Sequence, residues 1–232
     1  MELSNRLLEI VNFVPKGSSV ADIGTDHGYI PVYLIQNNIS KKVIASDISA
    51  GSLDKTIEYV NDLELNDKKY PKLGDGLDVL KPNEVDTVII AGMGGILISK
   101  ILENNKEISN TIENFIFQPM VASKELRQYL TNNGYIIVDE SLAKEGRKFY
   151  EIIYAKRGKS NIQRDIYYEI GLKLIENNHP LLKKFLEHKK NEIKEIISKL
   201  GNNDSNNTKS RYEELNRILE EYKEVEKEID SK

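Results

Sequence analysis

The chain has 232 residues, of which 33 are Lys or Arg and 37 are Asp or Glu, so its formal net charge at pH 7 is −4. It therefore lacks the overall basic charge of many nucleic-acid-binding proteins. It contains no cysteine, which excludes disulfides and thiolate metal sites and is typical of a reducing compartment. It has three histidines, no apolar run long enough to cross a membrane and no signal-peptide pattern at its start. We therefore expect a cytoplasmic protein without a resident metal.

Short apolar segments alternate with helical patterns as far as residue 156. Strands are predicted at 18–24, 42–47, 86–91, 115–117, 135–138 and 150–154, and helices at 3–14, 29–37, 50–63, 94–104 and 122–133. Ser4, Ser49 and Ser123 stand where helix N-caps are expected, and Gly134 ends the last helix. Strands that alternate with helices predict an α/β fold with a parallel, doubly wound sheet. The last two strands, joined by residues 141–148, predict an antiparallel hairpin, which is typical of the Rossmann-like class I methyltransferase sheet.

The pattern changes after residue 158 to helices without strands. Apolar residues recur at spacings of three and four from Leu182 to Leu200 and again from Leu215 to Ile229, with a polar loop at 201–207 between them. This predicts an antiparallel coiled-coil hairpin, and hence two domains, 1–158 and 159–232. Lysines outnumber glutamates between residues 183 and 199. That stretch either meets an anionic partner or is simply a solvated helix face.

The first predicted strand ends in a glycine-containing turn, Asp22-Ile23-Gly24-Thr25-Asp26-His27-Gly28-Tyr29, which leads into a helix. Gly24 permits a tight bend, and Gly28 permits a close approach of the helix to the sheet. A dinucleotide site needs glycines at the first, third and sixth positions, where this turn has Gly24, Asp26 and Tyr29. Because Asp26 would place a negative charge against a pyrophosphate, the turn argues against NAD and a dehydrogenase.

Carboxylates in and after this turn suit a cofactor that carries positive charge and no phosphate. S-adenosylmethionine has a sulfonium and an ammonium, for which Asp22 and Asp26 provide opposite charge. Asp47, with Ile48 beside it, follows the turn by about 20 residues, where an acid is expected to bind ribose hydroxyls. Gly74-Asp75-Gly76 occupies a place where methyltransferases often bind the adenine amino group. Together these residues predict an S-adenosylmethionine site.

The strand at 86–91 leads into a second glycine-rich segment, Ala91-Gly92-Met93-Gly94-Gly95. In such folds this position borders the transferable methyl group, although the same glycines also suit a tight strand-to-helix turn. The Asn/Asp-Pro-Pro-aromatic signature of enzymes that methylate exocyclic amines is absent. A ring nitrogen attacks through its own lone pair, so in-line placement would supply most of the catalysis. A nearby carboxylate would stabilise the positive charge that forms.

Several segments together resemble the bacterial tRNA (adenine(22)-N1)-methyltransferase family (TrmK). The matching segments are Leu3-Ser4-Asn5-Arg6-Leu7, 21–29, 74–77, 91–95, Phe117-Gln118-Pro119 and 149–153. The likeness covers roughly residues 3–156 in order, and the helical tail is similar to the family's C-terminal coiled coil. The resemblance implies methylation of N1 of an adenine in the D-arm region of tRNA, with both domains in contact with the RNA.

Residue roles follow from the motifs and the resemblance together. The expected cofactor-binding residues are Asp22, Gly24, Asp26, Gly28, Asp47, Ile48, Asp75, Gly76 and Gly92. The expected catalytic residues are Asp26, Met93 and Gly94, and the expected substrate-binding residues are Arg6, Gly95, Gln118, Lys183 and Lys190. No residue stands out as a general base. Because the net charge is negative, binding of tRNA requires a local basic surface.

Two alternatives of other kinds remain open at this point. One is a methyltransferase of the same fold that acts on a small molecule or a protein, with the coiled coil used for dimerisation; the acidic net charge favours it. The other is a non-catalytic nucleotide-binding module whose helical hairpin is the working part. Salt-sensitive tRNA binding would argue against the first, and binding of S-adenosylmethionine against the second. A monomer is expected rather than a homo-oligomer.

Overall fold

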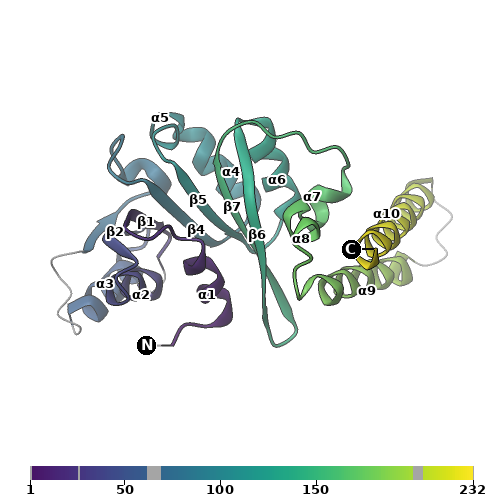
Figure 1. Cartoon of the computed structure of the whole chain (residues 1–232), viewed down its shortest axis with the longest axis horizontal. Helices are drawn as coiled ribbons and strands as arrows, with labels where there is room; N and C mark the ends of the chain where they lie inside the picture. The colour runs from purple at the N-terminus through teal and green to yellow at the C-terminus, as the bar shows by residue number, and fades with distance from the viewer. Residues whose placement is uncertain (1, 26, 62–68, 201–205, 232) are drawn as a thin grey trace. The chain divides into compact units, whose positions relative to one another are not determined.

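The computed structural model describes residues 2–25, 27–61, 69–200 and 206–231 (Figure 1). Contacts between Cα atoms divide the chain into two compact units, Met1–Asn161 and Ile162–Lys232. The first unit contains a sheet with helices on both faces, and the second is helical.

The sheet of the first unit has seven strands in the order β3-β2-β1-β4-β5-β7-β6. Its strands are β1 (Ser18–Ile23), β2 (Ser40–Asp47), β3 (Lys69–Leu73), β4 (Thr87–Met93), β5 (Asn114–Pro119), β6 (Tyr135–Glu145) and β7 (Lys148–Arg157). The first five run parallel, whereas β7 is antiparallel to both β5 and β6. The predicted fold class, a mostly parallel sheet with an antiparallel final hairpin, is confirmed.

Alternation of apolar side chains along the strands gives the sheet two buried faces. The helices are α1 (Asn5–Asn12), α2 (Tyr29–Gln36), α3 (Ala50–Asn61), α4 (Gly95–Asn104), α5 (Lys106–Ser109) and α6 (Ser123–Asn132), with a 3₁₀ turn η2 at Gly76–Val79. Helices α1 and α2 pack on the face that carries Val20 and Ile89, and α4 and α6 pack on the face that carries Ala21 and Ile90. The carboxyl ends of the parallel strands therefore lie at one edge between two layers of helix.

Three local features differ from the sequence prediction. Strand β3 was not predicted, because it is a short, lysine-containing edge strand that pairs only with β2, and Pro71 is tolerated there. The predicted connection at 141–148 is wrong, since β6 and β7 continue pairing until Glu145 meets Lys148 across a two-residue turn. Ser123 is the first residue of α6 rather than its N-cap, a position held by Ala122 with a φ of 59°.

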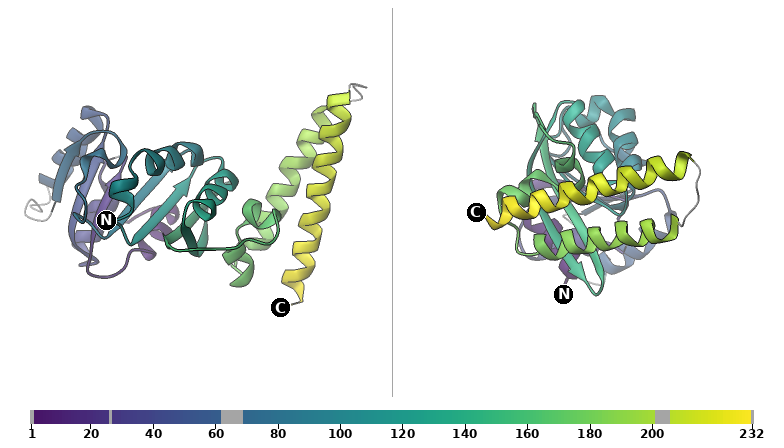
Figure 2. Two further views of the ribbon diagram at one scale, coloured as in Figure 1. Left: turned by 90° about the horizontal axis from the view of Figure 1, so that it is seen from above. Right: turned by 90° about the vertical axis from the view of Figure 1, so that its right-hand side faces the viewer.

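The second unit consists of α7 (Ile166–Ile170), α8 (Leu172–Glu176), α9 (Leu182–Leu200) and α10 (Asn206–Asp230). Helices α9 and α10 lie side by side and antiparallel, as the predicted hairpin requires (Figure 2). Their buried side chains are Leu182, Phe185, Leu186 and Ile193 of α9 and Leu215, Tyr222, Val225 and Ile229 of α10. Ile196, expected in this apolar stripe, is instead 42% exposed, and its neighbour Ile197 is the less exposed of the two. Most of the predicted loop between the helices, 201–205, lies outside the described residues.

Within the described part of the chain, no helix combines the length and the apolar character that a membrane span requires.

Candidate active site

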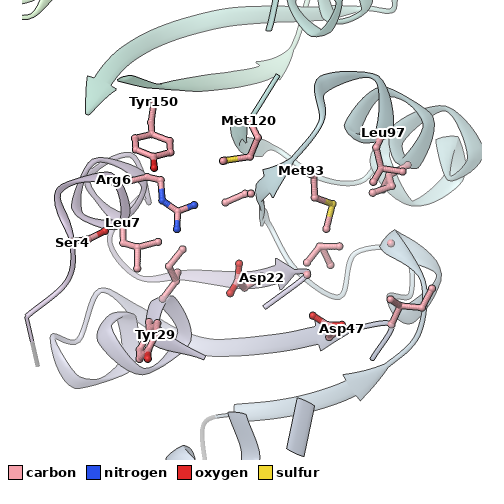
Figure 3. Close-up of a pocket in the computed structure, with 18 of the residues that line it drawn as sticks. Ser4, Arg6, Leu7, Asp22, Tyr29, Asp47, Met93, Leu97, Met120 and Tyr150 are labelled. Atoms are coloured by element: carbon pink, nitrogen blue, oxygen red, sulfur yellow. The ribbon is translucent and has the colours of Figure 1, made fainter. Parts of the chain in front are cut away.

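A pocket of about 1040 Å³ opens where the parallel strands end (Figure 3). It is lined by Glu2, Leu3, Ser4, Arg6, Leu7, Asp22, Ile23, Gly24, Tyr29, Ile30, Asp47, Ile48, Gly74, Asp75, Gly76, Ala91, Gly92, Met93, Leu97, Ile101, Met120 and Tyr150. The strand order reverses between β1 and β4, which makes this edge the topological switch point of the sheet. Ligands of doubly wound folds bind at this place, so the sheet topology and the position of the cavity indicate the same binding site.

The floor of the pocket is formed where β1 and β4 end beside each other. Gly24 has a φ of +75°, a left-handed conformation that a residue with a side chain adopts only with strain. A Cβ atom on Gly24 would also lie 2.2 Å from Cε of Met93. The backbone conformation therefore favours glycine after β1, and the flexible Met93 side chain fills the space beside it.

Asp22 contributes a buried carboxyl group to the pocket. It is 5% exposed on β1, and burial raises its pKa to about 7, with a further rise from the negative charge of Asp47. A carboxyl group in this condition is only partly ionised near neutral pH. A positively charged ligand in the pocket would restore its charge, because opposite charges favour the ionised form.

Asp47 ends β2 with its carboxylate held in a fixed orientation. Its Oδ1 accepts a 2.7 Å hydrogen bond from the backbone N–H of Ser49, and the Ser49 hydroxyl in turn accepts one from the N–H of Ser52 at the start of α3. Ser49 thus caps α3, as predicted. Ile48 lies between these residues with 71% of its surface exposed, so it offers an apolar contact at the rim of the pocket.

The segment Gly74-Asp75-Gly76 follows β3 and continues the wall beyond Asp47. A Cβ on Gly74 would lie 2.5 Å from Cγ1 of Val79, so the chain turns closely around the 3₁₀ turn η2. Asp75 is the N-cap of η2 and lines the pocket. The structure therefore brings the acids that end β1, β2 and β3 into one cavity.

Arg6 enters the pocket from α1, on the side of β4 and β5. Its Nη1 donates a 2.8 Å hydrogen bond to Oε1 of Gln118, and its Cζ lies 5.4 Å from the centre of the Tyr150 ring. Figure 3 shows the guanidinium group directed into the cavity below Tyr150.

Not every residue named from the sequence lines the pocket. Gly28, Gly94, Gly95 and Gln118 do not, Lys183 and Lys190 lie in the second unit, and Asp26 lies outside the described residues. Gly28 and Gly95 have packing roles at helix starts, because a Cβ would lie 2.6 Å from Cγ2 of Thr56 on Gly28 and would clash with the carbonyl oxygen of Ala122 on Gly95; Gly94 is the N-cap of α4. Gln118 is fully buried behind Arg6. Their direct roles in binding or catalysis stay predictions.

The two lysines of the second unit are held in ion pairs between the helices. Nζ of Lys183 lies 2.5 Å from Oδ1 of Asp230, and Nζ of Lys190 lies 2.6 Å from Oε1 of Glu226 and 2.8 Å from Oε2 of Glu187. Both ammonium groups therefore already have carboxylate partners. The predicted contact of these lysines with a substrate remains untested.

Several lining residues were not identified from the sequence. Tyr29, Leu97, Met120 and Tyr150 give the pocket an apolar and aromatic surface around its acids (Figure 3). Tyr29 follows the glycine turn directly, so its position was a usable signal. Tyr150 reaches the pocket only because the β6–β7 hairpin is longer than predicted, and its pairing with Ala143 could not be read from local sequence.

Comparison with known proteins supports the same fold and class of protein. A model of the methyltransferase domain matches residues 3–153. The tRNA (adenine(22)-N(1))-methyltransferase of Bacillus subtilis (strain 168) is 33% identical over 220 residues, which cover 95% of this chain and 88% of the relative. The crystal structure of the B. subtilis m1A22 tRNA methyltransferase TrmK has a TM-score of 0.87 at 31% identity and covers 97% of this chain and 98% of that chain. The structure of M. capricolum TrmK in complex with S-adenosyl-homocysteine has a TM-score of 0.82 at 30% identity, with 99% of each chain covered.

The sheet order, the terminal hairpin and the acidic pocket at the switch point define a methyltransferase of the Rossmann-like class. Within that class, similarity extends over nearly the whole chain, including the helical unit. The chain belongs to the TrmK family of tRNA (adenine(22)-N1)-methyltransferases. The family resemblance stated from the sequence is confirmed.

Proposed function

We propose that this chain transfers a methyl group from S-adenosylmethionine to N1 of adenine 22 in tRNA. The observation that carries the proposal is the pocket at the β1–β4 switch point, which joins Asp22, Asp47 and Asp75 to the Gly92–Met93 segment. The B. subtilis relative named for this activity covers 95% of the chain at 33% identity. When bound, the cofactor supplies a methyl group on a positively charged sulfur.

The chemistry of the lining residues fits this cofactor. Asp47 is positioned to accept hydrogen bonds from the ribose hydroxyls, because it lines the pocket at the end of β2 and one of its oxygens is held by the backbone N–H of Ser49. Asp75, one strand further, would accept from the adenine amino group. Asp22 supplies buried negative charge for a cationic ligand. Gly24 and Met93 both line the pocket, and the side chain of Met93 occupies the space beside the Cα of Gly24.

The end of β4 is the proposed place of methyl transfer. Gly92 and Met93 line the pocket there, and Met120 and Leu97 add an apolar surface. Adenine N1 has a lone pair, so it can attack without prior loss of a proton. The protein's main contribution is then to hold the base in line and to exclude water. Asp26 stays the predicted residue nearest to the reacting centre, and Gly94 and Gly95 the predicted neighbours of the base.

For tRNA, we propose that both units contribute phosphate contacts. Lys184, Lys194 and Lys199 are exposed on α9, and among the described residues no salt bridge within 4.0 Å is found for them, although the charge of Lys194 acts on nearby Glu187. Such side chains can neutralise phosphates without first breaking an existing pair. Lys183 and Lys190, in contrast, would have to exchange a carboxylate for a phosphate.

The proposal is tested by mapping the product of the reaction. A tRNA transcript is incubated with the protein and S-adenosylmethionine and then copied by reverse transcriptase, which stops at N1-methyladenine because the methyl group blocks base pairing. We expect a stop at position 22 that requires both protein and cofactor. Methyl incorporation at another position, or into an exocyclic amine that does not stop the copying, would contradict the proposal.

A further inference from the structure

The β6–β7 hairpin ends in a cluster of positive charge outside the pocket. This hairpin tip, residues 144–148, contains one acid, Glu145, and three cations, Lys144, Arg147 and Lys148. The three cationic residues are exposed, and no salt bridge within 4.0 Å is found for them among the described residues. In a chain whose net charge is −4, the hairpin tip is therefore a local excess of positive charge of the kind that binding to RNA requires.

The hairpin tip is held in place against the start of α1. Gly146, with a φ of +58°, closes the two-residue turn between the strands. Nδ2 of Asn5 donates a 3.4 Å hydrogen bond to the carbonyl oxygen of Lys144. The backbone N–H of Arg6 donates a 2.9 Å hydrogen bond to Oε1 of Glu145, so the one acid of the tip serves to attach it to the helix. A surface that is ordered before its ligand arrives loses less conformational freedom on binding.

The hairpin tip lies beside the pocket. Tyr150 lines the pocket from β7, and Lys148 stands two residues before it on the same strand. Because side chains alternate along a strand, these two project from the same face, roughly 7 Å apart along the strand. Strand β5 pairs with β7 only as far as Phe117 opposite Ile153, so the hairpin extends beyond its neighbouring strand (Figure 1). An RNA strand that delivers a base to the Tyr150 side of the pocket therefore comes close to the tip.

The charge of the pocket itself is opposite to that of the hairpin tip. The charged residues that line the pocket are four acids, Glu2, Asp22, Asp47 and Asp75, and one cation, Arg6. An acidic cavity can take up a neutral base but repels the phosphates on either side of it. The phosphates of a bound RNA strand are therefore expected outside the cavity, where the hairpin tip provides the opposite charge.

We propose that the hairpin tip binds the phosphates of the RNA strand next to the target nucleotide, an inference that rests on the proposed methylation of tRNA. Arg147 can bind phosphate oxygens through paired, charge-assisted hydrogen bonds, and Lys148 adds a point charge beside it. Contacts of this kind place a nucleic-acid strand without reading its sequence. The hairpin tip thus positions the backbone, while the pocket selects the base.

A matched pair of double variants tests the charge of the hairpin tip. Arg147→Ala/Lys148→Ala removes two exposed charges from the tip, and Lys16→Ala/Lys41→Ala removes two exposed charges at the amino ends of β1 and β2, the opposite edge of the sheet. We expect the tip variant to bind tRNA about 5- to 30-fold more weakly and to lower the salt dependence by about one to two units of slope. Its affinity for S-adenosylmethionine should be unchanged. Equal tRNA affinity of the two double variants in filter binding would overturn the proposal.

The place on the RNA is tested with a cleavage probe. Because the chain contains no cysteine, Arg147→Cys introduces a single thiol, to which an iron–EDTA group can be attached. The hydroxyl radicals that it generates should cut the tRNA at nucleotides next to position 22, and the same probe on Lys41→Cys should not. Cuts confined to a distant part of a tRNA that the protein still methylates at position 22 would overturn this inference and leave the proposed function intact. If the unaltered protein did not methylate position 22, the proposed function itself would fail, and this inference with it.

Discussion

Asp47 and Ser49 are joined by a 2.7 Å hydrogen bond from the Ser49 backbone N–H to Oδ1 of the Asp47 carboxylate. The bond connects the end of β2 to the start of α3. It also holds the Asp47 carboxylate in one orientation before any ligand binds. The pocket is therefore arranged in advance for a ligand with adjacent hydroxyl groups, which reduces the ordering that binding requires.

Replacement of Asp47 by alanine should weaken binding of S-adenosylmethionine by about 1.5–3 kcal/mol, because charge-assisted hydrogen bonds to the ribose would be lost. Asp47→Asn removes the negative charge but keeps an oxygen that can accept the hydrogen bond from the Ser49 N–H. It therefore shows whether the loss of affinity comes from the charge or from disturbance of α3. Calorimetric titration measures the affinity, and Asp54→Ala, an exposed acid on α3, is the control. Affinity of Asp47→Ala equal to that of the control would remove Asp47 from the cofactor site.

Cofactor affinity should depend on pH through Asp22. The pKa of this carboxyl group is raised to about 7 by burial, so it becomes increasingly protonated below that pH in the free protein. A cationic ligand favours the ionised form, and binding should therefore strengthen as pH rises from about 5 to about 7, by at most about tenfold per pH unit, and then level off. Asp22→Asn should bind more weakly and show a flatter profile over this range. A profile that is equally steep in both proteins would show that another group titrates.

Arg127 of α6 should be important for stability rather than for chemistry. Its side chain is 1% exposed, and it donates from Nε to Glu140 at 2.6 Å and from Nη2 to Glu151 at 2.7 Å, which fastens α6 to the β6–β7 hairpin. Arg127→Ala would remove the positive charge that two buried carboxylates share and should cost about 3–5 kcal/mol in the free energy of unfolding. Urea unfolding measures the loss. The control is Lys106→Ala, which breaks an exposed ion pair with Glu103 and should leave the urea concentration at the unfolding midpoint almost unchanged. If Arg127→Ala unfolded at the same midpoint as this control, the stabilising role of Arg127 would be contradicted.

Replacement of the lysines of α9 should have two different effects, on tRNA binding for exposed lysines and on stability for a lysine in an ion pair. Lys184 and Lys194 are exposed, so the double variant Lys184→Ala/Lys194→Ala should weaken tRNA binding and lower its salt dependence by about one unit of slope for each lost phosphate contact. Lys190 is 14% exposed between Glu187 and Glu226, so Lys190→Ala should mainly destabilise the helix pair. Filter binding at several salt concentrations and thermal unfolding measure the two effects. Unchanged tRNA affinity of the double variant would show that this face of α9 does not meet phosphates.

Much of the site could be predicted because parallel strands end at the same edge of a sheet. Once the strands ending near Ile23, Asp47 and Met93 had been recognised from their apolar pattern, the residues following them had to meet. The antiparallel hairpin was also predicted, because only residues 141–148 separate the last two apolar runs, although the strands pair further than predicted, to Glu145 and Lys148.

Other parts depend on contacts that local sequence does not encode. Strand β3 exists because β2 offers it an edge, not because its own residues form a continuous apolar run. The contact of Arg6 with Tyr150 joins residues far apart in the chain and requires the full length of the β6–β7 hairpin. The ion pair of Lys190 with Glu226 depends on the register of two helices, which the apolar spacing alone fixes only loosely.

Methyl transfer from radiolabelled S-adenosylmethionine to paired tRNA transcripts tests the central claim most directly. The two transcripts differ only at position 22, which is adenine in one and guanine in the other. We expect incorporation into the adenine transcript and loss of incorporation into the guanine transcript, with binding of the two transcripts to the protein compared as a control for folding of the RNA. Equal incorporation into both transcripts would contradict the assignment of adenine 22 as the target.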